Sequence, residues 1–135
     1  MCIRDRICLV YGATGIQKLG SSWFPWGDYS AVYYALLTPS WARFDLAGFA
    51  WAYPLTQVGT AVTWIWEVSF PVVMLWLWWR HTKERGGRAR RLAEKIDLRI
   101  PYVLIGLTMH GVLFLLMNLG PFSFITVSYL SLIHI

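Results

Sequence analysis

One uninterrupted apolar run, from Leu55 to Trp79, constrains the fold of this chain more than any other feature. The run holds one ionisable side chain, that of Glu67. At about 1.5 Å of helix per residue, it is long enough to cross a hydrocarbon core about 30 Å thick with some tilt. Aromatic residues typical of membrane interfaces stand at both of its ends: Trp51, Tyr53, Trp76, Trp78 and Trp79. We therefore expect a transmembrane helix over residues 55–79.

The chain as a whole is also too apolar for an ordinary soluble domain, with 57% hydrophobic and 14% charged residues and a mean hydropathy of +0.49. A second run, Tyr102 to Leu119, is just long enough to span, and only its His110 titrates near neutral pH. The predicted fold is all-α, a multi-span transmembrane helical bundle in the lipid bilayer. Its spans are expected at about 7–19, 55–79 and 102–119, with the start of another at 122–129. Residues 20–50 predict an extracytoplasmic segment with short or re-entrant helices.

The positive charge of the chain is concentrated between the two long runs. Residues 80–99 hold eight basic and three acidic side chains, a net charge of +5 that equals the excess of the whole chain. The positive-inside rule places such a loop in the cytoplasm. A nucleic-acid patch is the alternative, but the cluster lies directly between two expected spans, so we expect no nucleic-acid partner.

Both ends of the chain are expected to be foreign to the protein. Residues 1–6 and 130–135 can be encoded by two DNA strings that are reverse complements of each other. The strings look like a transposon end used in sequencing-library preparation. We therefore take residues 7–129 as a fragment of the natural protein and both hexamers as sequencing artefacts. Without the tails only Cys8 remains of the two cysteines, so neither a disulfide nor a cysteine metal site is expected.

Glu67 lies at the middle of the first apolar run, where an ionised carboxylate costs about 2.5 to 3.5 kcal/mol on insertion scales. It should therefore face protein or water. Thr56, Thr60 and Thr63 precede it on the same helix face. Pro71, four residues later, has no amide hydrogen for the Glu67 carbonyl and favours a kink. The alternative to a functional Glu67 is a protonated side chain that only joins helices.

His110 lies near the centre of the second run, with Gly106 and Met117 on a similar helix face. Because neighbouring spans run antiparallel, His110 and Glu67 should share a depth and could pair across the helix interface. An imidazole beside a carboxylate favours the charged forms of both. Catalysis or ligand contact and simple structural pairing explain this arrangement equally well.

Lys18 is the third candidate. It follows Gly12, Ala13, Thr14 and Gly15, small residues that permit close helix approach. An amine in apolar surroundings loses proton affinity and can serve as a base. A lysine one turn from a helix end also often reaches the headgroups without further function.

Three stretches, taken together, resemble the horizontally transferred transmembrane (HTTM) domain family, bacterial relatives of vitamin K-dependent γ-glutamyl carboxylase. They run from Tyr11 to Trp23, from Trp66 to Pro71, and from His110 to the Phe-Ser-Phe motif at 122–124. The resemblance implies a bacterial inner-membrane protein in which the lysine of a Gly-x-x-Lys-Leu motif, here Lys18, acts as base towards a reduced quinone. It also matches His110 to a later membrane histidine of the family. Nothing in the sequence itself suggests a metal site.

The leading hypothesis is therefore a quinol-dependent, carboxylase-like membrane enzyme. Lys18 would be the general base, and His110 and Glu67 would orient or stabilise the ligand between helices. The contrasting hypothesis is a non-enzymatic membrane protein, a transporter or an assembly factor. In that case the polar residues would line a path or join helices.

Overall fold

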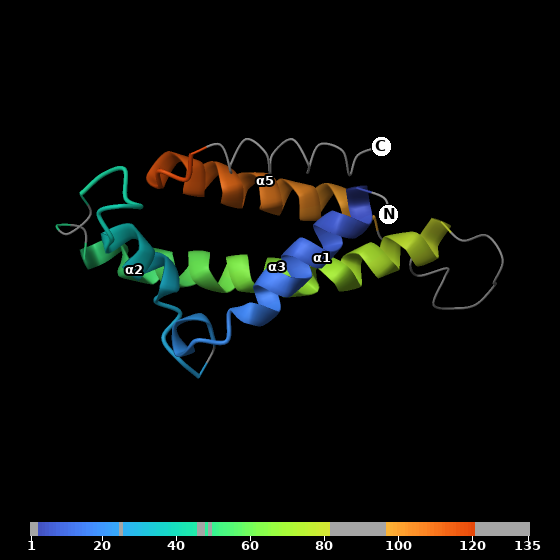
Figure 1. The fold of residues 1–135 in the computed structure, drawn as a ribbon, viewed down its shortest axis with the longest axis horizontal. Helices are drawn as coiled ribbons and strands as arrows, with labels where there is room; N and C mark the ends of the chain where they lie inside the picture. Colours follow the sequence, from blue (N-terminus) through green and yellow to red (C-terminus); the bar gives the residue numbers. More distant parts are fainter. Residues whose placement is uncertain (1–2, 25, 46–47, 49, 82–96, 121–135) are drawn as a thin grey trace.

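The computed structural model describes residues 3–24, 26–45, 48, 50–81 and 97–120. These residues fold into helices and connecting loops, and no strand longer than an isolated bridge occurs among them. The long helices are α1 (Ile3–Gln17), α3 (Tyr53–His81) and α5 (Arg99–Leu116), and shorter ones are η1 (Ser21–Trp23), α2 (Ala31–Leu37) and η2 (Ala50–Ala52). In Figure 1, α3 and α5 lie side by side along the length of the molecule and α1 crosses α3. The expected all-α class is confirmed.

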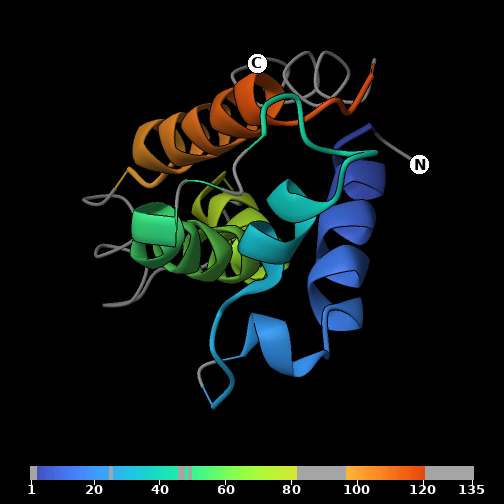
Figure 2. The same ribbon diagram turned by 90° about the vertical axis from the view of Figure 1, so that its left-hand side faces the viewer.

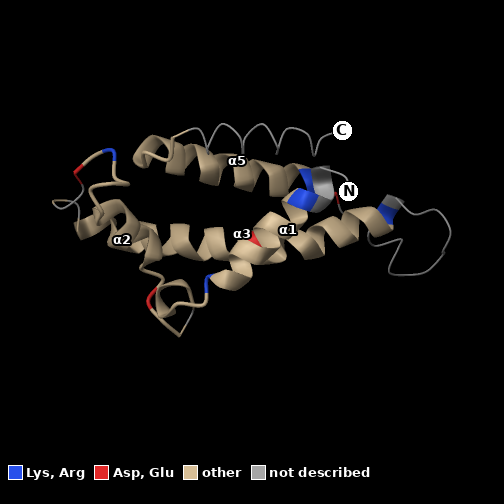
Figure 3. Ribbon diagram, viewed as in Figure 1, with Lys and Arg blue, Asp and Glu red and all other residues tan. Residues whose placement is uncertain are grey.

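Two helices, α3 and α5, are long and apolar enough to cross a membrane. With 29 and 18 residues they measure about 43 and 27 Å at 1.5 Å per residue. Both are tan, without basic or acidic residues, over most of their length in Figure 3. The two apolar helices predicted over 55–79 and 102–119 are thus confirmed, although they begin and end at other residues than predicted.

The surface of α3 is apolar and its buried side is partly polar. Its exposed side chains repeat every three or four residues along one face: Leu55, Val58, Val62, Ile65, Val68, Val72 and Leu75. Thr60, Thr63 and Glu67 are buried on the opposite side. α5 also has a polar side chain inside and apolar side chains outside, because His110 is buried while Leu104 and Val112 are exposed. A helix of a soluble domain is expected to show the reverse distribution.

The end of α5 differs from the sequence prediction, which carried the helix to residue 119. The helix stops at Leu116 because the following backbone bonds to the loop before η2. The amide of Arg43 donates to the Leu116 carbonyl at 3.0 Å, and the amide of Asn118 donates to the Trp41 carbonyl at 2.7 Å. The predicted helix over 122–129, the predicted foreign tail 130–135 and most of the basic loop, 82–96, lie outside the described residues.

The segment from 20 to 50 contains short helices, as predicted, and α2 packs on α3. The amide of Val32 donates to the hydroxyl of Thr60 at 3.1 Å, and this hydroxyl donates to the Thr56 carbonyl at 2.9 Å. The Gln57 amide donates to the Asp28 carbonyl at 2.6 Å. Hydrogen bonds from Ser30 lower the pKa of the Asp28 carboxyl.

Two glycines allow α1 to approach α3 closely. A Cβ atom on Gly12 would lie 2.8 Å from a ring carbon of Pro71, and one on Gly15 would lie 2.9 Å from the backbone nitrogen of Val68. The small-residue stretch therefore does what its sequence predicted. α3 continues through Pro71 as one helix, and the proline ring packs against α1 at Gly12.

An aromatic core joins α1, α3 and α5. The buried cluster consists of Ile7, Tyr11, Trp66 and Phe70. The indole of Trp66 donates to the Tyr102 carbonyl at 3.0 Å, and the Tyr102 hydroxyl donates back to the Trp66 carbonyl. Their rings stack with centroids 5.1 Å apart. These reciprocal bonds fix the register of α5 on α3 at Trp66, directly before Glu67.

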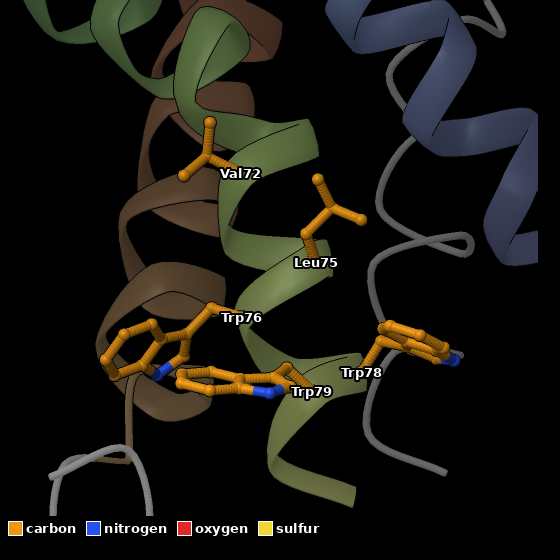
Figure 4. A pocket seen from close by; sticks show the side chains of 5 residues that line it. All are labelled: Val72, Leu75, Trp76, Trp78 and Trp79. Atoms are coloured by element: carbon orange, nitrogen blue, oxygen red, sulfur yellow. The ribbon is translucent and has the colours of Figure 1, made fainter. Parts of the chain in front are cut away.

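The C-terminal end of α3 carries the tryptophans that the sequence predicted as an interfacial anchor. Figure 4 shows Trp76 and Trp79 together on one side of the helix and Trp78 pointing to the other. With Val72 and Leu75 they line a surface hollow of about 340 Å³. At the same end of the molecule, Asp97 lies 2.8 Å from Arg99 and 3.4 Å from Arg80. The hydrogen bonds from Arg99 hold the pKa of the Asp97 carboxyl well below its usual range.

Candidate functional site

A pocket of about 540 Å³ lies between the helices and contains all three residues singled out from the sequence. Figure 2, which looks roughly along α3, shows α1 and α5 on two adjoining sides of α3 with α2 between them. Most of the lining is apolar, and its polar side chains are Tyr11, Thr14, Lys18, Thr63, Glu67 and His110. Arg6 also lines the pocket but belongs to the foreign tail predicted at residues 1–6.

Lys18 and Glu67 form an ion pair at this pocket. The ammonium nitrogen lies 2.6 Å from one carboxylate oxygen and 2.5 Å from the other. Glu67 is buried, with 7% of its surface exposed, at the middle of α3. A buried carboxylate needs such a partner, because desolvation of an unpaired charge is costly. Of the two predicted surroundings of Glu67, protein or water, the structure shows protein, because the side chain is buried.

The reach of Lys18 follows from its place directly after α1. Gly15 brings the end of α1 against the backbone of Glu67 and Val68, and Lys18 follows within one turn. The ring of Trp23 covers the ammonium from another side, with its centroid 4.4 Å from Nζ. Lys18 is therefore held between a carboxylate and an aromatic face.

His110 is buried and bonds to α1. Its Nε2 atom lies 3.1 Å from the hydroxyl oxygen of Tyr11. The Tyr11 ring is in turn packed against Trp66 and Phe70, with centroids 4.9 Å away in each case. Gly106 and Met117, which the sequence placed on the same face as His110, are also buried.

The predicted pairing of Glu67 with His110 does not occur. Both line one pocket, yet each takes its partner from α1 or the residue just after it: Glu67 pairs with Lys18 and His110 bonds to Tyr11. The central positions of both residues in their apolar runs correctly predicted that they are buried, but the residue just after α1 supplies a stronger partner for the carboxylate. An ammonium with two short contacts satisfies both oxygens of Glu67.

The sequence reasoning did not assign roles to Tyr11 and Trp23. A signal for Tyr11 was available, because Tyr11, Thr14 and Lys18 are spaced three and four residues apart and share one helix face. All three line the pocket. Trp23 had no comparable signal, since its position depends on the turn after α1.

The threonines before Glu67 have mainly structural contacts. Thr60 and Thr63 are buried and Thr56 is half-buried, so the predicted inward stripe is confirmed. The hydroxyl of Thr63 donates to the Gly59 carbonyl at 2.8 Å, and that of Thr56 donates to the Tyr53 carbonyl at 2.7 Å. The hydroxyl hydrogens of both residues are therefore used within their own helix.

Comparisons of the chain with protein-family models, with curated proteins and with solved structures found no match. The likeness to the HTTM domain family therefore stays a prediction that depends on the short stretches quoted above. Within the described ranges, no group of three or more His, Cys, Asp or Glu side chains could hold a metal ion.

Proposed function

We propose that the chain is part of a multi-span membrane enzyme of the carboxylase-like type. Its pocket would bind a reduced quinone, and the Lys18–Glu67 pair would take a proton from it. The observation that carries the proposal is the contact of both Glu67 oxygens with the Lys18 ammonium inside an apolar pocket. An ion pair at that depth is unusual unless it binds or moves charge.

The distribution of side chains on α3 and α5 supports the membrane location. Exposed leucine, valine and isoleucine face outwards, while Glu67 and His110 face inwards. In water these helices would expose a long apolar surface, whereas in a lipid bilayer the same side chains would contact apolar lipid chains. The positive charge of residues 80–99 favours the cytoplasmic side for the connection between α3 and α5.

The pocket fits a flat lipophilic ligand. Its volume of about 540 Å³ lies within the range of small-molecule sites, which are mostly apolar with a few placed polar groups. Tyr11 and Trp23 are the aromatic residues in its lining. When bound, a reduced quinone supplies a hydroxyl proton and reducing electrons. Lys18, Glu67 and His110 are the residues that would contact its oxygens.

The two charged groups would act as one base. A protonated lysine has no lone pair, so Lys18 alone cannot accept a proton while it carries its charge. The Glu67 carboxylate has free lone pairs and can accept a proton, and the adjacent ammonium stabilises the charge that remains in the pocket. Alternatively, Lys18 first passes its proton to Glu67 and then accepts another as an amine. In both routes the pair gains one proton.

Substitution of either partner should abolish proton abstraction. We expect Lys18→Met and Glu67→Gln each to lower hydroquinone-dependent CO2 fixation or oxygen consumption about 100-fold or more in a full-length protein. Arg43→Met, outside the pocket, is the control and should retain activity. Activity that persists without Lys18 would refute the proposal.

A non-enzymatic role is the second candidate, and one observation favours it. The Lys18–Glu67 and Tyr11–His110 contacts join the first helix to α3 and to α5, so they could serve only to hold the helices together. In that case a Lys18→Met/Glu67→Leu double variant would keep full function. Proton-coupled transport that depends on Glu67 would instead support a transporter.

The membrane topology can be tested independently. A cysteine at position 21, in η1, and one at position 88, in the basic loop, should react with an impermeant maleimide from opposite sides of the membrane. The background needs Cys2 and Cys8 replaced by serine. Positive-inside orientation places Arg88→Cys on the cytoplasmic side. Labelling of both positions from one side would contradict the proposed topology.

A further inference from the structure

We infer that Tyr11 fixes the tautomer of His110, so that the imidazole presents Nδ1–H to the pocket as a hydrogen-bond donor. The ligand must then place an acceptor oxygen next to His110. The inference deepens the proposed function, because it concerns the same pocket and the class of group that the pocket recognises. It rests on that proposal only for the ligand, since the tautomer is a property of the protein alone.

The hydrogen bond between Tyr11 and His110 allows two arrangements. Either the hydroxyl donates to Nε2, or a protonated Nε2 donates to the hydroxyl oxygen. Within the described residues the Tyr11 hydroxyl contacts no hydrogen-bonding group other than this nitrogen. In the second arrangement its hydrogen would be buried without an acceptor, which costs the full desolvation of the group. The first arrangement leaves only Nδ1–H without a partner, whereas the second leaves both the hydroxyl hydrogen and the Nδ1 lone pair without one.

A neutral imidazole that accepts at Nε2 carries its hydrogen on Nδ1. The described part of the chain supplies no acceptor for Nδ1–H, and His110 lines the pocket. A donor that opens into an apolar pocket is complementary to a carbonyl, ether or anionic oxygen. The Glu67 carboxylate, in contrast, is complementary to a hydroxyl. The two polar parts of the pocket therefore recognise opposite hydrogen-bonding groups.

Tyr11 is thus a positioning residue, and its ring is held independently of its hydroxyl. Trp66 and Phe70 pack against the ring, and Tyr102 holds Trp66 from α5. Tyr11→Phe should therefore keep the core and the pocket shape. The substitution removes only the hydroxyl that selects the tautomer.

Nitrogen NMR of isotope-labelled histidine in detergent micelles tests the inference, at a pH well above the ordinary histidine pKa of about 6.5. His110→Asn identifies the signals of His110. We expect the Nδ1–H form to dominate in the unmodified chain and the ratio of tautomers to fall several-fold in Tyr11→Phe. Tyr34→Phe, at an exposed tyrosine, is the matched control and should change nothing.

A separate NMR measurement tests whether the Nδ1–H group binds an acceptor oxygen of the ligand. Naphthoquinone, which carries acceptor oxygens, should shift the Nδ1–H signal, and naphthalene, which carries none, should not. A dominant Nε2–H form in the unmodified chain would overturn the inference even if Tyr11→Phe fails to fold. An unchanged ratio in folded Tyr11→Phe would overturn it as well. Loss of quinol-dependent activity leaves the tautomer result standing, so the two proposals can fail separately.

Discussion

Lys18→Met is expected to lower the free energy of unfolding by about 3 kcal/mol, the cost of removing one partner from a buried ion pair. The Lys18 side chain is 23% exposed and that of Glu67 only 9%, so solvent screens the pair weakly. Methionine keeps much of the apolar stem of lysine but leaves the Glu67 carboxylate uncompensated. The measurement is a denaturant titration of the protein in detergent micelles.

Two further variants separate the ion pair from general packing. Lys18→Met/Glu67→Leu removes both charges and should recover most of the loss, because an apolar pair of similar size needs no desolvated partner. Arg99→Met breaks a contact with Asp97 in which both side chains are more than a third exposed, so it should cost far less stability than Lys18→Met. Equal losses for Lys18→Met and Arg99→Met would show that the carboxylate is not held as an ion pair.

The sequence predicted which residues face inwards better than it predicted their partners. Glu67 and His110 were placed in the interior from their positions within apolar runs, and both are buried. Helix periodicity identifies a face but does not say which neighbour covers it. Their partners, Lys18 and Tyr11, lie 49 and 99 residues away along the chain, and no local pattern links them.

The ends of the helices were predicted less well for a related reason. Apolar residues continue past Leu116, so hydropathy extends the helix to residue 119. The helix ends earlier because Leu116 and Asn118 bond to the backbone of Trp41 and Arg43. This contact joins segments that are distant in the chain, and composition carries no information about it.

The glycines of α1 were the most informative local signal, because a small residue has a direct steric consequence. Gly15→Ala is expected to destabilise the protein by about 1 to 3 kcal/mol, as overpacking does in a close-packed interface. The new Cβ would meet backbone atoms of α3, 2.9 Å from the Val68 nitrogen and 3.1 Å from the Glu67 carbonyl carbon. Backbone atoms cannot rotate away, so α1 must move.

The same substitution at Gly59 on α3 provides a matched control, because a Cβ there would meet nothing within 4 Å. Alanine favours a helix over glycine by about 1 kcal/mol at either position, so the difference between the two variants isolates the steric clash. Movement of α1 also carries Lys18 away from Glu67. Lys18→Met should therefore cost less in the Gly15→Ala background than in the unmodified chain, measured as a double-mutant cycle. Additive losses would mean that the close approach at Gly15 does not position the ion pair.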